Sequence, residues 1–326
     1  MDGLNDTQRY FVEEHVEDFR DGLIGRRELI RRVAIVVGGA AAATTLLAAC
    51  DLSPRATGTA TPTADAATAS STPGLVAQPF ATPPPAATTD GVTVKENDPR
   101  IAVSKPEIKG TDGVSLMAYV AKPIVSGRVP GVMVIHENRG QTEHIRDVVR
   151  RAATAGFVAV NIDLVARQGG GEKLGDVVTG AIGNLPLQQR LDDHTAALIY
   201  LKANTSGAVG AVGFCFGGGE VWNLLAAGVD VRGAVPYYGP QPSNYQEIGS
   251  KTKAATLAVY AEQDTRITST APQMEEQLKK AGVPNQILVF PGVNHAFHND
   301  TGARYAPEAA QKAWVATIEW FRKYLV

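Results

Sequence analysis

Residues 208–219 read Ala-Val-Gly-Ala-Val-Gly-Phe-Cys-Phe-Gly-Gly-Gly, and this stretch decides how the rest of the chain is interpreted. An apolar run that favours a strand leads into a tight turn around Cys215, and residues 220–227 favour a helix. Glycines at 213 and 217 flank the cysteine because so tight a turn leaves no room for side chains. A single cysteine is often only a buried apolar residue. Here the flanking pattern instead predicts a Cys215 thiol at a helix start, where free backbone N–H groups favour a thiolate and can bind an oxyanion.

Two residues that can activate a thiol come later in the chain, each directly after an expected strand. Asp264 follows the apolar run 256–260, and His295 follows the run 286–290. His295 would accept the proton of the Cys215 thiol and act as general acid and base, while Asp264 would fix the tautomer of the ring. Taken alone, either is commonly a loop or capping residue. The order nucleophile, acid, histidine is that of α/β-hydrolases, so the three together predict a catalytic triad.

The pattern around these residues alternates strands and helices. We expect strands at 113–120, 130–136, 157–162, 208–214, 233–237, 256–260 and 286–290, and helices at 143–155, 188–203, 220–227, 271–281 and 307–324. This alternation predicts an α/β protein of the α/β-hydrolase fold, with a mostly parallel central sheet and helices on both faces. Ligands of such sheets bind beyond the carboxyl ends of the strands, where the candidate residues fall.

Composition limits the other classes of function. The chain has 326 residues, of which 44% are hydrophobic, and a net charge of -2, so it lacks the basic footprint of a nucleic-acid-binding protein. Its two cysteines, Cys50 and Cys215, lie in different settings and show no metal-ligand spacing. We therefore expect no cofactor, no metal and no nucleic-acid partner, and the sequence leaves the oligomeric state open.

Residues 1–50 are typical of a bacterial export signal. A charged, helix-favouring segment ends in Arg26-Arg27-Glu-Leu-Ile, which resembles a twin-arginine signal with Gly25 where serine or threonine is usual. The uncharged residues 33–49 follow. They end in Leu-Ala-Ala before Cys50, which resembles a lipobox whose cysteine is lipidated and becomes the mature N-terminus. The alternative is an uncleaved signal anchor. Either interpretation predicts an exported protein tethered to a membrane on its extracytoplasmic side.

Two further segments follow the signal. Residues 51–91 are rich in Ala, Thr and Pro and lack apolar periodicity, which is typical of a flexible linker. Residues 92–326 carry the strand and helix pattern and form the expected hydrolase domain.

Over roughly residues 100–326 the sequence resembles the dienelactone hydrolase family. The resemblance rests on the cysteine turn and on residues 136–140, 163–170, 260–267 and 294–297, in the order expected across the domain. It implies that Glu137 lies beside Cys215 and helps to control the protonation of the thiol. It also implies an oxyanion hole formed by the backbone N–H groups of Asn138 and Phe216. Without the resemblance, Glu137 would be interpreted as a strand-end residue paired with a base.

The resemblance further implies that Arg167 binds a substrate carboxylate, for which a planar guanidinium is suited. The second substrate-binding arginine of the family is replaced here by Asn299. His298 and Arg304 are candidates to compensate for it. This difference leaves the exact substrate open.

The sequence thus predicts a hydrolase that cleaves a small ester or lactone, of the carboxymethylenebutenolide kind, through a Cys-His-Asp triad and a covalent acyl-enzyme. Two alternatives stay open. One is a general carboxylesterase or thioesterase, and the other is a non-catalytic surface lipoprotein that binds a ligand on a hydrolase scaffold.

Overall fold

The computed structural model describes residues 3–48, 50, 52–53 and 92–326. Apart from residues 52 and 53, the linker predicted at 51–91 lies outside the described residues and stays a prediction.

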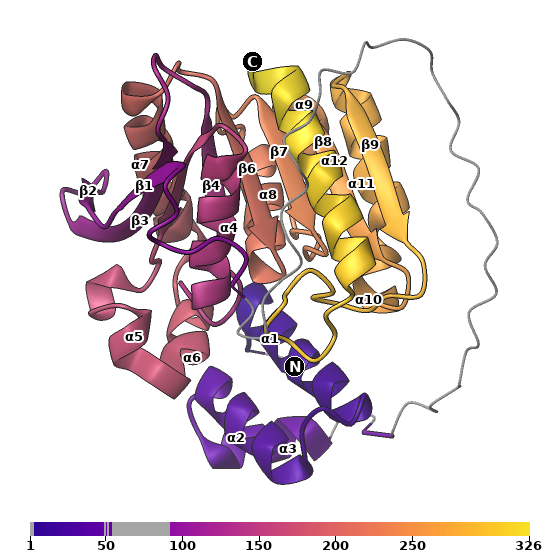
Figure 1. The fold of residues 1–326 in the computed structure, drawn as a ribbon. Helices are drawn as coiled ribbons and strands as arrows, with labels where there is room; N and C mark the ends of the chain where they lie inside the picture. Colours follow the sequence, from indigo (N-terminus) through magenta and orange to yellow (C-terminus); the bar gives the residue numbers. More distant parts are fainter. Residues whose placement is uncertain (1–2, 49, 51, 54–91) are drawn as a thin grey trace.

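The central sheet is mostly parallel, as predicted. It has the strand order β1-β3-β5-β4-β6-β7-β8-β9, with β2 paired to β3. Strands β4 to β9 run parallel to one another, and β1, β2 and β3 add an antiparallel edge (Figure 1). The strands are β1 (Ile101–Ser104), β2 (Glu107–Lys109), β3 (Ser115–Pro123), β4 (Gly131–Ile135), β5 (Val158–Ile162), β6 (Val209–Phe214), β7 (Gly233–Tyr237), β8 (Ala255–Ala261) and β9 (Asn285–Phe290).

Helices cover both faces of this sheet. The hydrolase domain contains α4 (Glu143–Thr154), η1 (Ala166–Gln168), α5 (Gly171–Leu174), η2 (Gly175–Val177), α6 (Val178–Gly183), α7 (Leu187–Asn204), α8 (Phe216–Ala227), η3 (Tyr245–Glu247), α9 (Ile248–Lys251), α10 (Thr265–Thr268), α11 (Ala271–Ala281) and α12 (Pro307–Leu325). Parallel strands are joined by right-handed crossovers, so the face that a helix covers depends on the direction in which the chain crosses the sheet. The crossover through α4 runs from β4 to β5, in the direction opposite to the crossovers through α7 and α8. Accordingly, α4 lies on one face of the sheet together with α12, and α7 and α8 lie on the other face (Figure 1).

The core lies between these helices and the sheet. All five residues of β4 and all six of β6 are buried, as expected for central strands covered on both faces. On α12, Trp314 and Ile318 are buried. The sheet thereby forms a rigid base on which the loops after its strands are held.

The N-terminal segment forms three helices that pack against this domain: α1 (Asp6–Arg20), α2 (Arg26–Val37) and α3 (Ala40–Ala48). They lie at the end of the sheet where the parallel strands terminate (Figure 1), and α1 and α2 both contact α6. Asn5 caps α1 by accepting a hydrogen bond from the Gln8 amide. Phe11 and Leu29 are fully buried. The residues that the sequence predicts to be an export signal therefore pack as part of the folded structure.

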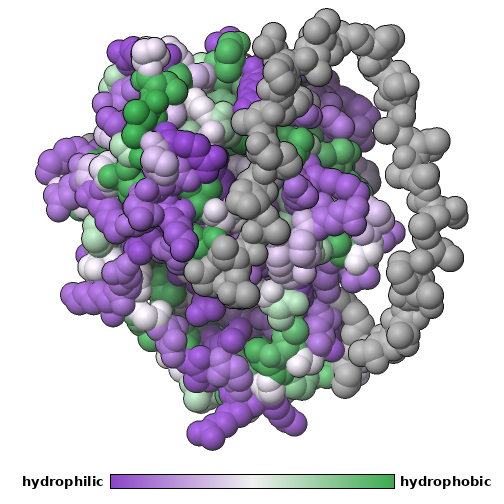
Figure 2. All heavy atoms as spheres, viewed as in Figure 1, coloured by the Kyte–Doolittle hydropathy of each residue, from purple (hydrophilic) through white to green (hydrophobic). Residues whose placement is uncertain are grey.

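Among the described helices, none is by itself long and apolar enough to cross a membrane, whereas α2 and α3 pass that test together but are bent by 113°. At this lower end of the molecule, apolar side chains appear among hydrophilic ones on the surface in view (Figure 2).

Candidate active site

The turn between β6 and α8 holds Cys215 in the backbone conformation that its sequence predicts. Cys215 has φ 58° and ψ -122°, outside the regions that a side chain normally prefers. A Cβ atom on Gly213 would lie 2.0 Å from the Gly217 carbonyl oxygen, and one on Gly217 would lie 2.4 Å from the Ile135 carbonyl oxygen. Only glycine therefore fits on either side of the cysteine. The Gly218 and Gly219 N–H groups of the first turn of α8 donate to the Cys215 carbonyl oxygen at 2.9 and 3.2 Å, and the start of a helix carries a partial positive charge that favours a thiolate.

The two predicted partners of Cys215 lie beside it. Asp264 follows β8 and His295 follows β9, and the His295 Nδ1 is 2.6 Å from the Asp264 Oδ2. The Nε2 side of the ring faces Cys215, because Tyr10 and Glu14 each contact both Nε2 and the Cys215 Sγ. Cys215 is 4% exposed and His295 is 5% exposed. The structure thus brings the three residues together, and their catalytic roles stay a prediction.

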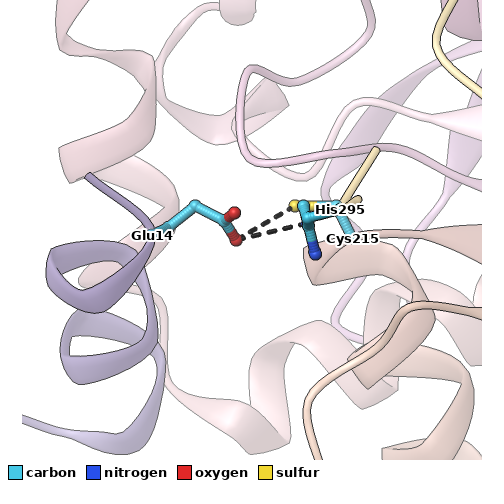
Figure 3. A group of neighbouring side chains, drawn as sticks. All are labelled: Glu14, Cys215 and His295. Carbon is cyan, nitrogen blue, oxygen red and sulfur yellow. Dashed lines mark hydrogen bonds and ion pairs between the residues drawn. The ribbon is translucent and has the colours of Figure 1, made fainter. Parts of the chain in front are cut away.

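Helix α1 covers this pair and contributes two side chains that the sequence analysis missed. The Tyr10 hydroxyl lies 3.2 Å from the Cys215 Sγ and 3.4 Å from the His295 Nε2. The Glu14 Oε2 lies 3.8 Å from the same Sγ and 3.3 Å from the same Nε2 (Figure 3). Carboxylate, imidazole and thiol are all metal ligands, so Glu14, Cys215 and His295 form a set that could hold a metal ion.

Apolar and charged contacts hold α1 in place. Phe11 packs edge-on against Phe216, with ring centroids 5.5 Å apart. The Arg266 guanidinium lies 3.4 Å from Glu13 and 3.6 Å from Glu14, and it stacks over the Tyr10 ring.

The C-terminal end of α1 is anchored in the same way. Arg304 donates hydrogen bonds to Asp18 at 2.8 Å and to Asp21 at 2.7 Å, and Asn294 donates to Asp21 at 3.1 Å. Acidic residues of α1 are thus matched by basic and polar residues around the catalytic pair.

The charges on α1 set the protonation of this centre. Burial opposes the charged form of His295, but the carboxylates of Glu14 and Asp264 raise the pKa of His295 well above its ordinary value. Burial, and then the Glu14 carboxylate, raise the pKa of the Cys215 thiol. Burial would also raise the pKa of Glu14, yet His295 and Arg266 lower it overall. The docked state therefore favours a protonated His295 paired with an ionised Glu14, next to a neutral thiol.

Glu137 lies near the catalytic pair, as the resemblance implies. Burial raises the pKa of Glu137, and its charge contributes to the raised pKa of Cys215. Asn299, which stands in place of the family arginine, donates a hydrogen bond of 2.5 Å to the Glu137 Oε2. Asn138 lines the cavity next to Cys215, and Phe216 begins α8. The oxyanion hole expected from their N–H groups stays a prediction.

The three expected substrate-binding residues lie in different places. Arg304 lines the cavity, but its guanidinium is bound by α1. His298 is buried and stacks on Phe214 in the core, and burial lowers its pKa well below the ordinary value. Arg167 is paired with Asp193 at 2.5 Å and Asp112 at 2.8 Å, and it is not among the residues that line the cavity. Their substrate roles stay predictions.

A cavity of about 550 Å³ opens beside Cys215 and His295. Its walls come from two parts of the chain. One wall belongs to the loops that follow the strands, and the other belongs to the N-terminal helices and the turn between them, including Glu14, Asp18, Leu23, Ile24, Arg32 and Ile35. The volume suits a small molecule.

The cysteine sits in a strained turn after a central parallel strand, and a carboxylate and a histidine follow β8 and β9. This arrangement defines an α/β-hydrolase with a thiol in the position of the nucleophile. The model of the dienelactone hydrolase family matches residues 116–325. The chain belongs to this family and is a hydrolase of the ester or lactone type.

Known proteins of similar sequence agree with this assignment. A Methylorubrum extorquens protein named "Putative carboxymethylenebutenolidase" is 33% identical over 228 residues, which cover 65% of this chain and 78% of that protein. A Bradyrhizobium protein named "Probable 2-oxo-3-(5-oxofuran-2-ylidene)propanoate lactonase" is 30% identical over 231 residues, which cover 66% of this chain and 92% of that protein. A crystal structure of a "Putative Dienelactone Hydrolase" from Klebsiella pneumoniae is 29% identical with a TM-score of 0.63, and the match covers 69% of this chain and 99% of that one.

Proposed function

We propose that this protein hydrolyses a small ester or lactone through Cys215, His295 and Asp264, with a covalent acyl-enzyme. The observation that supports the proposal most is the placement of the His295 ring, whose Nδ1 meets Asp264 at 2.6 Å while its Nε2 side faces the thiol. With Nδ1 protonated and held by the carboxylate, Nε2 is the nitrogen that would accept the thiol proton once its contact with Glu14 is released. The names of the relatives support an ester or lactone as the substrate class.

In this mechanism His295 Nε2 takes the thiol proton as the Cys215 Sγ attacks the carbonyl carbon. The N–H groups of Asn138 and Phe216 would stabilise the oxyanion that forms. When the tetrahedral intermediate collapses, the leaving oxygen takes the proton from His295, and the acyl group remains on Sγ as a thioester. His295 then removes a proton from water, which attacks the thioester. The acid is released and the thiol regains its proton.

The test is hydrolysis of a panel of short aryl esters and lactones by the full chain. Cys215→Ala and His295→Ala are expected to lose activity, while Cys50→Ala, which removes the other cysteine, serves as the matched control. The comparison is made on substrates that the parent chain hydrolyses, if necessary after removal of the residues before Cys50. Equal rates for the four proteins on such a substrate would refute the triad. A preference for thioesters over esters and lactones would instead support the thioesterase alternative.

We further propose that the N-terminal segment directs export and that Cys50 is lipidated. The resemblance of residues 26–30 to a twin-arginine signal supports this, and Arg26 and Arg27 are exposed, as a signal read by a receptor requires. Cys50→Ala is expected to release the protein from the membrane fraction. If the variant stays as firmly bound as the parent chain, residues 33–49 act as an uncleaved anchor instead.

A further inference from the structure

Helix α1 lies where a substrate must approach the nucleophile. A carbonyl carbon has to come within about 3–3.5 Å of the sulfur to react, and the Tyr10 hydroxyl already lies 3.2 Å from it. Glu14 fills the neighbouring position, in contact with both the thiol and the imidazole. The side of Cys215 and His295 that Glu14 faces in Figure 3 is therefore occupied by side chains of the same protein, Glu14 and Tyr10.

The docked helix also opposes the chemistry. The triad needs a neutral His295 to accept the thiol proton. In the docked state Nε2 is instead in contact with the Glu14 carboxylate at 3.3 Å and the Tyr10 hydroxyl at 3.4 Å, so these groups stand where the thiol proton would have to be transferred. A substrate that enters the cavity would thus meet Tyr10 and Glu14 against both the sulfur and the Nε2 of His295.

The docking surface is built for an acidic amphipathic helix. Its apolar part accepts Phe11, which packs against Phe216. The Phe11 ring also lies close to Gly183, since a Cβ atom built on this glycine would be 3.4 Å from the ring. Its charged part consists of Arg266, which meets Glu13 and Glu14 in the middle of α1, and Arg304, which meets Asp18 and Asp21 at its C-terminal end. Apolar and charged contacts together fix one position and one direction of the helix.

The docked helix and the surface that it covers lie on opposite sides of the proposed processing site. The residues of α1 precede Cys50, whereas Phe216, Arg266 and Arg304 belong to the domain that follows it. Cleavage before Cys50 would convert a contact within one chain into a complex of two chains, which can dissociate.

We propose that α1 is an intramolecular inhibitor of the hydrolase, and that removal of the residues before Cys50 activates the enzyme. This inference rests on the proposed function for its catalytic consequence. Its physical core is the blocked access to Cys215, which can be measured without any hydrolysis.

The experiment uses the full chain with a site-specific protease sequence inserted immediately before Cys50. The rate at which iodoacetamide alkylates Cys215 and the rate of aryl-ester hydrolysis are measured on the same sample before and after cutting, with Cys50 changed to Ser. We expect both rates to rise at least about 10-fold once the released segment has been removed by gel filtration. A synthetic peptide of residues 3–24 should restore inhibition in competition with the ester. The peptide with Glu14→Ala should inhibit more weakly, and the peptide with the exposed Arg9→Ala should inhibit as well as the parent peptide.

The outcomes separate the two proposals. Faster alkylation without any hydrolysis refutes the proposed function and supports the blocking role of α1. Unchanged or slower alkylation in a cut protein that keeps its circular dichroism spectrum overturns the inference. If the cut protein unfolds, alkylation is measured instead on the uncut variants Tyr10→Phe and Glu14→Gln, in which the contacts of α1 with Cys215 are weakened. Faster alkylation of Cys215 supports the inference, and unchanged rates overturn it.

Discussion

Replacing Phe11 with alanine should expose the catalytic cysteine by loosening α1. The Phe11 side chain is 0% exposed and packs against Phe216. Truncation of a buried phenylalanine to alanine costs about 3–5 kcal/mol. Because the lost contacts are those between α1 and the domain, most of this cost falls on the docking of the helix rather than on the stability of the sheet. A loss of about 3 kcal/mol corresponds to a rise of about 10²-fold in the undocked population.

The assay is alkylation of Cys215 by iodoacetamide in the Cys50→Ser background, followed by intact-mass spectrometry. When undocking is faster than the chemical step, the alkylation rate follows the undocked population, so it should also rise by about 10²-fold. Phe321→Ala is the matched control, since Phe321 is equally buried but lies in α12. It should lower global stability without a comparable rise in alkylation. An unchanged rate for Phe11→Ala, or an equal rise for Phe321→Ala, would refute the reasoning.

Three further predictions concern the catalytic centre. Glu14→Gln should lower the pKa of His295, because it removes the negative charge that favours the protonated ring, and an NMR titration of the histidine rings measures this directly. Asp264→Asn should reduce kcat by about 10²-fold or more with little change in KM, because the amide no longer holds the proton on His295 Nδ1; steady-state kinetics on the cleaved enzyme decide the point. Gly217→Ala should destabilise the fold by about 2 kcal/mol or more, because its Cβ atom would lie 2.4 Å from the rigid Ile135 carbonyl oxygen, and a denaturant titration that matches the parent chain would contradict this.

The fold, and the position of Cys215, Asp264 and His295 at one edge of the sheet, could be predicted because their signals are local. Each central strand is a short apolar run followed by a turn. The glycines at 213 and 217 indicate one tight turn around Cys215 within a stretch of five residues. Asp264 and His295 each follow directly after such a strand, so their place at the same edge of the sheet follows from the strand order.

The role of α1 could not be predicted in this way. Its contacts with the catalytic pair join Tyr10 to Cys215 and to His295, across 205 and 285 residues of sequence. A charged helix ahead of an apolar segment is also what an export signal requires, so the local pattern had a sufficient explanation without any docking. Neither Tyr10 nor Glu14 belongs to a motif that marks it as part of a site.

The sequence by itself determined the α/β class, the nucleophile turn and the order of the triad, because these depend on neighbouring residues and on the regular geometry of a parallel sheet. Only the tertiary structure decided what lies against the thiol and what Arg304 binds. The basic groups around the site and the acidic groups on α1 are far apart in the sequence, and their pairing depends on how the helix packs on the finished domain. The turn around Cys215 therefore indicates a nucleophile, while the packing of α1 places Tyr10 and Glu14 against it.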